Sequence, residues 1–340
     1  MSAAPLPDTP IDWQALPKVL LHEHLDGGLR PQTLLELCQA RGLATPAADA
    51  LALAAWVQAN ANSGSLGRYL QGFALTVAAM GSLQACERVA FEAAEDAHED
   101  GCVLAEFRIA PLLLEAFGLQ GEAVVEALLA GLRRSALPCG LIVCAMRTDS
   151  PDKTQRSAAL AARYAGAGVI GFDLAGAELE HPPAPHARAF ATARDAGLGL
   201  TCHAGEADFG ARVLEAAALG ATRIGHGIHV VQDARDVQRA RELGLHFEVC
   251  PSSNVHTGAA TSLATHPLGA MLRAGLSVSV STDNRLMSGV SLSNELQALH
   301  EVAGLSLAQI VELNRAAAMA SFMPKATREA ALDAIVMGRK

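Results

Sequence analysis

The feature that most constrains the fold of this chain is the alternation of short apolar segments with stretches of helical periodicity. Most of the apolar segments are uninterrupted, as in strands that are buried on both faces of a parallel sheet. Helical patterns such as Ala85–Glu99, Ala123–Ser135, His186–Ala196 and Asp233–Leu243 separate them. The expected strands are Val19–Leu25, Val103–Ala110, Leu141–Arg147, Val169–Leu174, Leu198–His203, Arg223–His226, Leu245–Cys250 and Leu276–Thr282.

The number of these segments favours a (β/α)8 TIM-type barrel over its rival, a doubly wound sheet. From the third segment onward the strands begin about 22–32 residues apart, which is one strand–helix unit each. The much longer interval after the first strand predicts a helical lid insertion over residues 32–80. Residues 306–340 predict helices packed outside the barrel. We therefore expect residues 1–340 to form a single barrel domain.

Composition excludes several classes of partner. The 35 acidic residues outnumber the 26 basic ones, giving a net charge of −9, and no basic stripe is present. Nucleic acid and anionic membranes are therefore not expected partners. No apolar run is long enough to span a membrane, and the segment 1–12 does not resemble a secretory signal. Together with 7 scattered cysteines, these features predict a cytoplasmic protein with a small-molecule partner.

Histidines and a carboxylate stand where four of the expected strands end. His22 and His24 point to the same side of the first strand and can chelate one metal ion. His203, His226 and Asp283 stand at the ends of the fifth, sixth and eighth strands. Because those strand ends converge on one face of a barrel, we expect the five side chains to meet there.

The donor types indicate which metal would bind. Three neutral imidazoles and one carboxylate suit Zn²⁺, which keeps a water in the remaining position. Bound zinc lowers the pKa of that water toward about 7. Glu206 lies just past a ligand and is expected to transfer protons, and His226, between two glycines, to orient the hydroxide. We assign one Zn²⁺ per chain to His22, His24, His203 and Asp283.

Other cofactor chemistries lack their signatures. Pro138-Cys139 is not followed by the second Cys of the cytidine-type zinc deaminases, and no HExxH is present. The G-x-G-x-x-G string at 166–171 precedes a strand instead of opening a helix, so it does not indicate dinucleotide binding. No lysine falls at an expected inner strand end, which argues against a Schiff-base aldolase and against a lysine-bridged pair of metals.

Six strings together resemble the adenosine deaminase family of metal-dependent barrel hydrolases. The resemblance spans roughly residues 17–325 and implies hydrolytic deamination of adenosine and 2′-deoxyadenosine to inosine or 2′-deoxyinosine and ammonia. The strings, in the family's order, are Leu21-His22-Glu23-His24-Leu25-Asp26-Gly27, Phe172-Asp173-Leu174-Ala175-Gly176, His203-Ala204-Gly205-Glu206, Gly225-His226-Gly227, Cys250-Pro251-Ser252-Ser253-Asn254 and Ser281-Thr282-Asp283.

The resemblance implies a role for each matching position. It gives the same four zinc ligands, with Glu206 protonating N1 of the purine and His226 positioning the attacking hydroxide. It implies substrate contacts from His24, from Asp26 to a ribose hydroxyl, from the backbone of Gly176 to the purine ring, from Asn284 to N7, and from Tyr69 and Phe73, which cap the sugar.

This sequence departs from the family's pattern at two positions. Asn284-Arg285 stands where a second aspartate and a proline often follow the eighth strand, and Ala177 replaces an acid. An amide can still donate a hydrogen bond to N7. Adenine or a 5′-modified adenosine such as aminodeoxyfutalosine therefore remains an alternative substrate, and a non-catalytic barrel that binds a nucleoside or a protein is a third possibility.

Some polar residues are expected to be structural. Arg108 is expected to form a buried charge pair near the barrel floor. The histidines outside the matched strings are assigned to surface or structural positions: His98, His181, His186, His229, His246, His256, His266 and His300.

Overall fold

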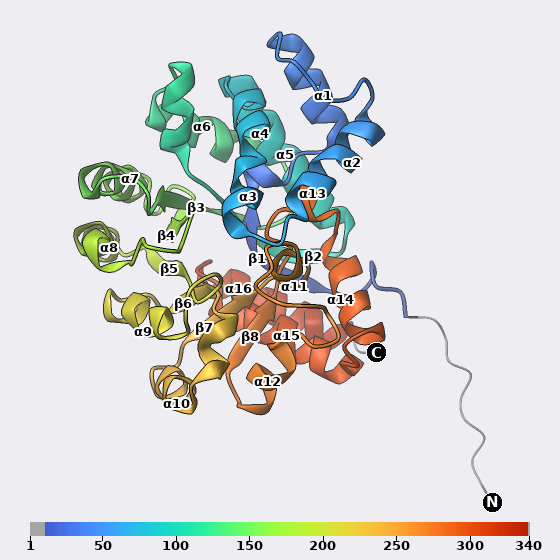
Figure 1. The fold of residues 1–340 in the computed structure, drawn as a ribbon, viewed down its shortest axis with the longest axis vertical. Helices are drawn as coiled ribbons and strands as arrows, with labels where there is room; N and C mark the ends of the chain where they lie inside the picture. Colours follow the sequence, from blue (N-terminus) through green and yellow to red (C-terminus); the bar gives the residue numbers. More distant parts are fainter. Residues whose placement is uncertain (1–10, 339–340) are drawn as a thin grey trace, which may run out of the picture.

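Eight parallel strands form the centre of the molecule and a ring of helices surrounds them in the computed structural model, which describes residues 11–338 (Figure 1). Neighbouring strands pair in sequence order, and the first strand meets the segment just after the last one in a parallel bridge between Glu23 and Asp283. The predicted (β/α)8 barrel is therefore confirmed. The strands are β1 Lys18–His24, β2 Cys102–Ile109, β3 Cys139–Met146, β4 Val169–Ala175, β5 Gly199–Ala204, β6 Arg223–His226, β7 His246–Val249 and β8 Ser277–Val280.

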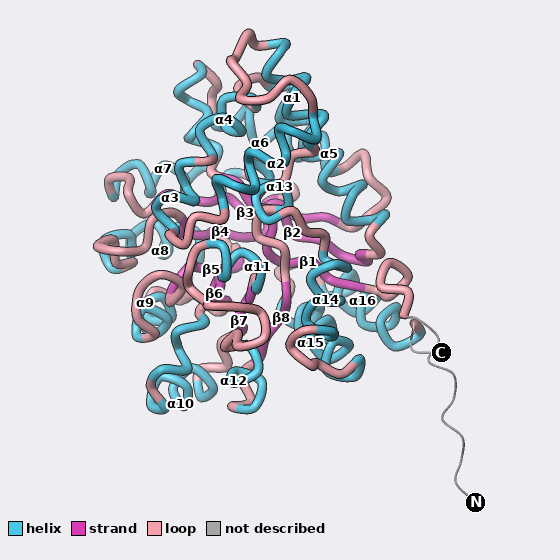
Figure 2. The backbone as a smooth tube through the Cα atoms, turned by 45° about the vertical axis from the view of Figure 1, so that its right-hand side comes forward, coloured by secondary structure: helices cyan, strands magenta, loops and turns pink. Residues whose placement is uncertain are grey.

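The helices of the outer layer lie between successive strands and after the last one (Figure 2). Within the described residues, none of them has both the length and the apolarity needed to cross a bilayer. They are α5 Leu83–Glu99, α6 Gly121–Leu132, α7 Pro151–Arg163, α8 Ala187–Asp195, α9 Ala211–Ala218, α10 Ala234–Glu242, α12 Leu268–Arg273, α14 Leu292–Glu301, α15 Leu307–Ala320 and α16 Lys325–Met337.

Further short helices lie between β1 and β2 and in the loops after other strands. The interval between β1 and β2 holds η1 Leu25–Gly27, α1 Pro31–Ala40, α2 Ala50–Ala61, α3 Leu66–Gln71 and α4 Phe73–Ala79, ahead of α5. The other short helices are η2 Pro111–Phe117, η3 Ala184–His186, η4 Ile228–Gln232, α11 Pro251–His256 and α13 Arg285–Ser288.

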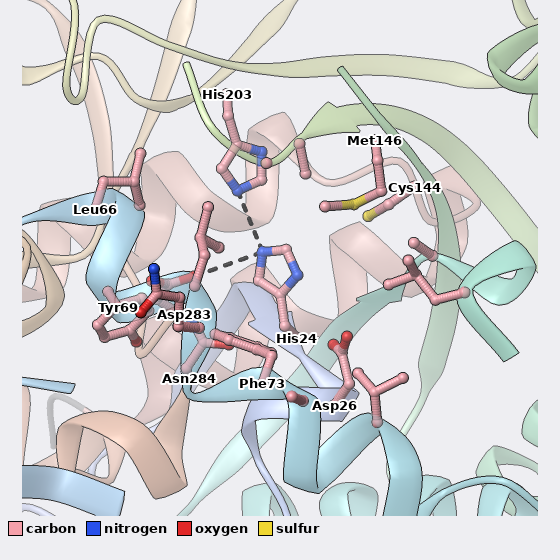
Figure 3. A pocket seen from close by; sticks show the side chains of 18 of the residues that line it. His24, Asp26, Leu66, Tyr69, Phe73, Cys144, Met146, His203, Asp283 and Asn284 are labelled. Carbon is pink, nitrogen blue, oxygen red and sulfur yellow. Dashed lines mark hydrogen bonds and ion pairs between the residues drawn. The ribbon is translucent and has the colours of Figure 1, made fainter. Parts of the chain in front are cut away.

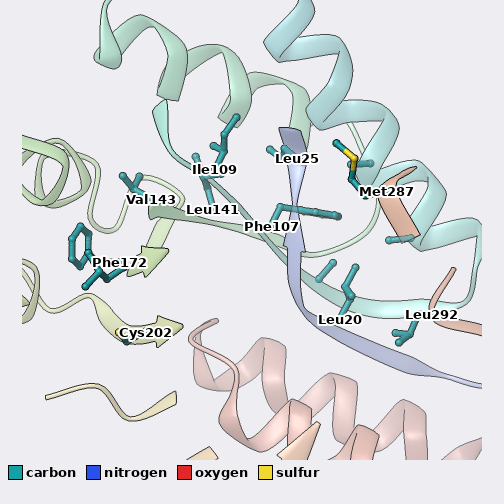
Figure 4. Close-up of a cluster of buried hydrophobic side chains, with 14 of the residues drawn as sticks. Leu20, Leu25, Phe107, Ile109, Leu141, Val143, Phe172, Cys202, Met287 and Leu292 are labelled. Carbon is teal, nitrogen blue, oxygen red and sulfur yellow. The ribbon is translucent and has the colours of Figure 1, made fainter. Parts of the chain in front are cut away.

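Apolar side chains on the outer face of the barrel pack against the helices. Phe107, Leu141 and Phe172 belong to one buried cluster that runs around the barrel (Figure 4). Val19 and Leu21 belong to a second cluster, which includes apolar residues of α15 and α16. The C-terminal helices therefore cover the strands at the start of the chain.

The inside of the barrel is charged. Arg108 of β2 donates to Asp173 of β4 at 2.9 Å and to Glu248 of β7 at 2.5 Å. Arg223 of β6 pairs with the same Glu248 and, at 2.6 Å, with Glu106 of β2. Bonds between strands that are not neighbours in the sheet can only cross the interior. The buried charge pair expected of Arg108 is confirmed, but it lies next to the strand ends that carry the candidate metal ligands instead of at the barrel floor.

Removal of one cation from this network should destabilise the fold strongly. Arg108→Met leaves the fully buried carboxylates of Asp173 and Glu248 with less positive charge around them. Loss of one partner of a buried ion pair costs about 3–5 kcal/mol, so we expect a fall of that size in the free energy of unfolding, measured by denaturant titration.

The matched control is Arg163→Met. The Arg163 side chain is 66% exposed and pairs with Glu122 at the surface, where an ion pair contributes about 0–1 kcal/mol. Equal losses of stability in the two variants would contradict the assignment of a structural role to Arg108.

Candidate metal and proton-transfer site

A cavity of about 480 Å³ lies where the strands end and is bounded on one side by α3 and α4 (Figure 3). It brings together residues that are far apart in the sequence. Of the site residues named from the sequence, only His22 is not in its lining, because it lies deeper and is fully buried. The named residues that line it are His24, Asp26, Tyr69, Phe73, Gly176, His203, Glu206, His226, Asp283 and Asn284.

Four of the site residues named from the sequence, including the deeper His22, converge on one point. One ligand atom from each of His22, His24, His203 and Asp283 lies within 4.8 Å of all the others. The Nε2 atom of His24 is 3.3 Å from that of His22 and 3.2 Å from that of His203. Asp283 Oδ1 lies 3.4 Å and 3.5 Å from the Nε2 atoms of His22 and His24.

Buried carboxylates determine which ring nitrogens face this point. Glu248 accepts a hydrogen bond from Nδ1 of His22 at 2.9 Å, and Asp173 accepts one from Nδ1 of His203 at 3.1 Å. The rings therefore carry their protons on Nδ1 and turn unprotonated Nε2 atoms toward one another. Lone pairs that face each other repel unless a cation lies between them, and carboxylate-oriented imidazoles are typical of metal sites. The donor set therefore fits a single divalent cation.

The backbone adopts an uncommon conformation at two of these strand ends. His226 and Asp283 both have φ of 60°, in the left-handed region that non-glycine residues rarely occupy. Such conformations are concentrated at functional sites. A Cβ atom at Gly225 would lie only 3.0 Å from Cε1 of His22, so a glycine at this position lets β6 approach the cluster closely.

Glu206 lies beside the cluster in a position to exchange a proton. Its Oε1 accepts hydrogen bonds from Thr257 Oγ1 at 3.1 Å and Asn254 Nδ2 at 3.4 Å, while Oε2 lies 3.6 Å from His226 Nε2. Burial raises the pKa of Glu206 to about 7, and the negative charge of Asp283 acts in the same direction. A carboxyl group with this pKa can hold and release a proton near neutral pH.

Glu178, which was not among the site residues expected from the sequence, organises the loop that carries Glu206. The buried Glu178 carboxylate accepts hydrogen bonds at 2.5–3.2 Å from four consecutive backbone N–H groups, those of residues 205–208. Its only sequence signal is that it is an acid two residues after Gly176, in the loop that follows β4. One side chain thus satisfies donors that would otherwise be buried without partners.

Asp26 lines the cavity and has an acceptor without a partner in the described part of the chain. Burial raises the pKa of its carboxyl group to about 7. Its Oδ1 atom is buried and has no hydrogen-bond partner among the described residues. Such an atom normally has a partner, so a donor on a ligand would satisfy it.

Tyr69, Phe73 and Asn284 form another part of the cavity wall. The rings of Tyr69 and Phe73 lie 5.9 Å apart, and the Tyr69 hydroxyl faces Asn284, Ser253 and Ser288. The hydroxyl is buried and has no hydrogen-bond partner among the described residues, so Tyr69 contributes an unpaired polar group in addition to the apolar face expected from the sequence. A Cβ atom at Gly27 would lie 1.9 Å from Oδ1 of Asn284, so a glycine is needed there for Asn284 to lie where it does.

Most of the remaining histidines are engaged elsewhere. His186 bonds to Thr154, His246 to serines of β8, and His229 to the carbonyl of Asp208. His266 differs, because it contacts Asn254, which in turn contacts His226. The sequence analysis placed His266 with the structural histidines, since nothing in its neighbouring residues indicates this connection.

Known proteins resemble this chain in sequence. A protein named adenosine deaminase from Mycobacterium bovis is 40% identical, and the alignment covers 100% of this chain and 98% of that protein.

Solved structures resemble it in fold. Adenine deaminase from Arthrobacter aurescens is 27% identical with a TM-score of 0.85, covering 95% of this chain and 99% of that one. The N6-mAMP deaminase of Arabidopsis is 25% identical with the same TM-score of 0.85, covering 96% of this chain and 99% of that one. The family model described as Adenosine deaminase matches residues 17–337. The chain therefore belongs to the adenosine deaminase family.

Proposed function

We propose that this chain hydrolyses adenosine and 2′-deoxyadenosine to inosine or 2′-deoxyinosine and ammonia, with one Zn²⁺ per chain. The observation that carries the proposal is a single cavity into which both a three-histidine, one-carboxylate cluster and the buried acid Glu206 open. The 40% identity to a protein named adenosine deaminase supports the same reaction. All 7 cysteines are free, which supports a cytoplasmic location.

The donor set supports zinc as the metal. Buried carboxylates orient the imidazoles of His22 and His203, and Ser253 Oγ donates to the Asp283 carboxylate at 2.6 Å. Three imidazoles and one carboxylate held in this way are typical of zinc sites that keep a position for water. When bound by His22, His24, His203 and Asp283, Zn²⁺ would lower the pKa of a coordinated water toward about 7 and so supply the nucleophile.

Two residues would move or hold protons during the reaction. Glu206, whose pKa is raised to about 7 so that it can hold a proton near neutral pH, gives this proton to N1 of the purine. This withdraws electron density from C6, where the nucleophile attacks. His226 holds the attacking oxygen in line. The Glu206 carboxylate then takes the proton of the added hydroxyl group and passes it to the amino group, which leaves as ammonia while the C6–O double bond forms.

The remaining contacts hold the nucleoside. Oδ1 of Asp26 accepts a hydrogen bond from a ribose hydroxyl, and the amide of Asn284 donates to N7. The backbone of Gly176 meets the ring, and Tyr69 and Phe73 cap the sugar. In this proposal the described chain acts as one barrel domain, and the helical insertion over residues 32–80, whose α3 and α4 border the cavity, is its lid.

The cavity favours a neutral nucleoside over the alternatives. No Lys or Arg lines it in the part of the chain that the structure describes, so the phosphate of AMP or the carboxylate of aminodeoxyfutalosine would lack a cation partner. Free adenine would leave Asp26 Oδ1 without a donor, which costs affinity. The complete cluster together with Glu206 argues against a non-catalytic binding barrel.

Replacement of the proton donor tests the chemistry. Glu206→Gln keeps the shape of the side chain and removes the transferable proton, so kcat on adenosine should fall about 10²–10⁴-fold. Zinc content, measured by atomic emission, should stay at one per chain because Glu206 is not a proposed ligand. Glu215→Gln, on the surface of α9, is the matched control and should keep full activity. Near-normal turnover by Glu206→Gln would remove Glu206 from this role.

Glu178 should support activity through the loop that it holds. Glu178→Gln turns an amide N–H₂ toward backbone donors, so we expect a loss of about 1–3 kcal/mol in unfolding free energy. We expect kcat to fall by up to about 10²-fold as Glu206 loses its position. Faster amide exchange at residues 205–208 would report the loosened loop. The exposed neighbour Glu180 gives the control Glu180→Gln, and unchanged exchange in Glu178→Gln would contradict the assignment.

Substrate preference separates the proposed reaction from its alternatives. We expect kcat/KM for adenosine and 2′-deoxyadenosine to exceed that for adenine, AMP and aminodeoxyfutalosine by at least about 10²-fold, measured in parallel by ammonia release. Asp26→Ala should lower kcat/KM for adenosine and leave adenine unaffected. Inertness toward all five compounds with zinc bound would exclude this substrate class.

A further inference from the structure

We propose that Asn254 is a positioning residue that determines where the protons lie on His226 and Glu206, and that His266 sets the direction of its hydrogen bonds. This inference rests on the proposed deaminase function. The residues form a continuous chain of hydrogen bonds that starts at a backbone N–H group and ends in the cavity.

The donor-to-acceptor direction of these hydrogen bonds is determined at the end that lies farthest from the cavity. The backbone N–H of Leu268 donates to Nδ1 of His266 at 3.0 Å. A backbone N–H can only donate, so this nitrogen carries no proton. Burial lowers the pKa of His266 to about 4, so the ring is neutral and its one proton lies on Nε2. That Nε2 lies 3.3 Å from Oδ1 of Asn254 and donates to it.

The side-chain amide of Asn254 transmits this direction. Because its oxygen faces a donor, its nitrogen must face the other two partners, and it offers them two N–H groups. One N–H donates to Nδ1 of His226 at 3.0 Å. The other points to Oε1 of Glu206 at 3.4 Å. Asn254 is fully buried, so no solvent competes for either bond.

The two acceptors are therefore left with defined protons. His226 Nδ1 accepts from Asn254, since a proton there would place two N–H groups face to face at 3.0 Å. The ring proton must lie on Nε2. Oε1 of Glu206 already accepts from Asn254 and from Thr257 Oγ1 at 3.1 Å, which leaves Oε2 as the oxygen that takes up and gives back a proton.

The proton on His226 Nε2 and the proton that Glu206 Oε2 exchanges then both lie on the side of these residues that faces the cavity. His226 Nε2 and Glu206 Oε2 are 3.6 Å apart, and both residues line the cavity. With its proton on Nε2, His226 donates a hydrogen bond to the attacking oxygen and cannot remove a proton from it. Glu206 is the residue left to exchange protons with the substrate.

The test reads the proton positions directly by NMR on zinc-loaded protein with ¹⁵N-labelled histidine. Long-range ¹H–¹⁵N spectra distinguish the two neutral tautomers, and His226→Gln identifies the His226 signals by their loss. We expect the wild type to show His226 protonated on Nε2 and His266 also protonated on Nε2. A wild-type His226 that carries its proton on Nδ1 would overturn the proposal.

Variants of the chain should change these signals and the rate together. Asn254→Asp has nearly the same shape but only accepts, so it should move the His226 proton to Nδ1 and lower kcat about 10²-fold or more with KM nearly unchanged. His266→Leu should release the amide and give mixed His226 tautomers. His266→Gln restores an N–H donor toward Asn254 and should rescue both the Nε2 tautomer and kcat.

The controls separate this proposal from the proposed function and from simple misfolding. Asn294→Asp makes the same change at an exposed position of α14 and should leave both readouts unchanged. An Asn254→Asp protein that keeps the wild-type tautomer and kcat would overturn the proposal. If wild-type protein shows the expected tautomers but deaminates no adenosine, the proton placement is supported and the deaminase function is not.

Discussion

The orientation of the candidate metal ligands depends on carboxylates that are themselves buried inside the barrel. Asp173 and Glu248 hold the rings of His203 and His22, and neither carboxylate is stable at such a depth without a nearby positive charge. Arg108 contacts both of them and is fully buried. The interior that fills this barrel and the groups that aim the ligands are therefore one network, so that the fold and the site cannot be altered independently.

A second principle of the site is that the surrounding groups determine which partner donates and which accepts in each hydrogen bond. Glu178 saturates four backbone donors in the loop of Glu206, which leaves the acid's own side chain to the cavity. Asn254 and Thr257 occupy one oxygen of that acid. Because these side chains are buried, an acceptor without a donor is costly, and this cost is what keeps the protons in place.

Much of the fold and of the site could be predicted from the sequence because two simple periodicities hold. Uninterrupted apolar runs mark strands with helices outside them, and alternation on β1 places His22 and His24 on one side. The convergence of strand ends then brings distant ligands together. Glu178 and His266 escaped prediction because their partners are backbone N–H groups or side chains in other loops. The residues next to them in the sequence do not indicate which loops will lie beside them in the fold. The partners of Arg108, 65 and 140 residues away, and the hydroxyl contacts of Tyr69 were missed for the same reason.

The barrel closes at the place where the ligands stand. Between β1 and the end of β8 the backbone bonds are those from His24 N–H to Asp283 O at 2.7 Å and from Asp283 N–H to His22 O at 2.9 Å. Three of the four ligands therefore belong to this junction. A cation held there would link β1 to the segment that follows β8, since it ties together positions whose separation in the sequence makes their encounter entropically unfavourable. Uptake of the ion and closure of the barrel would then be two aspects of one event.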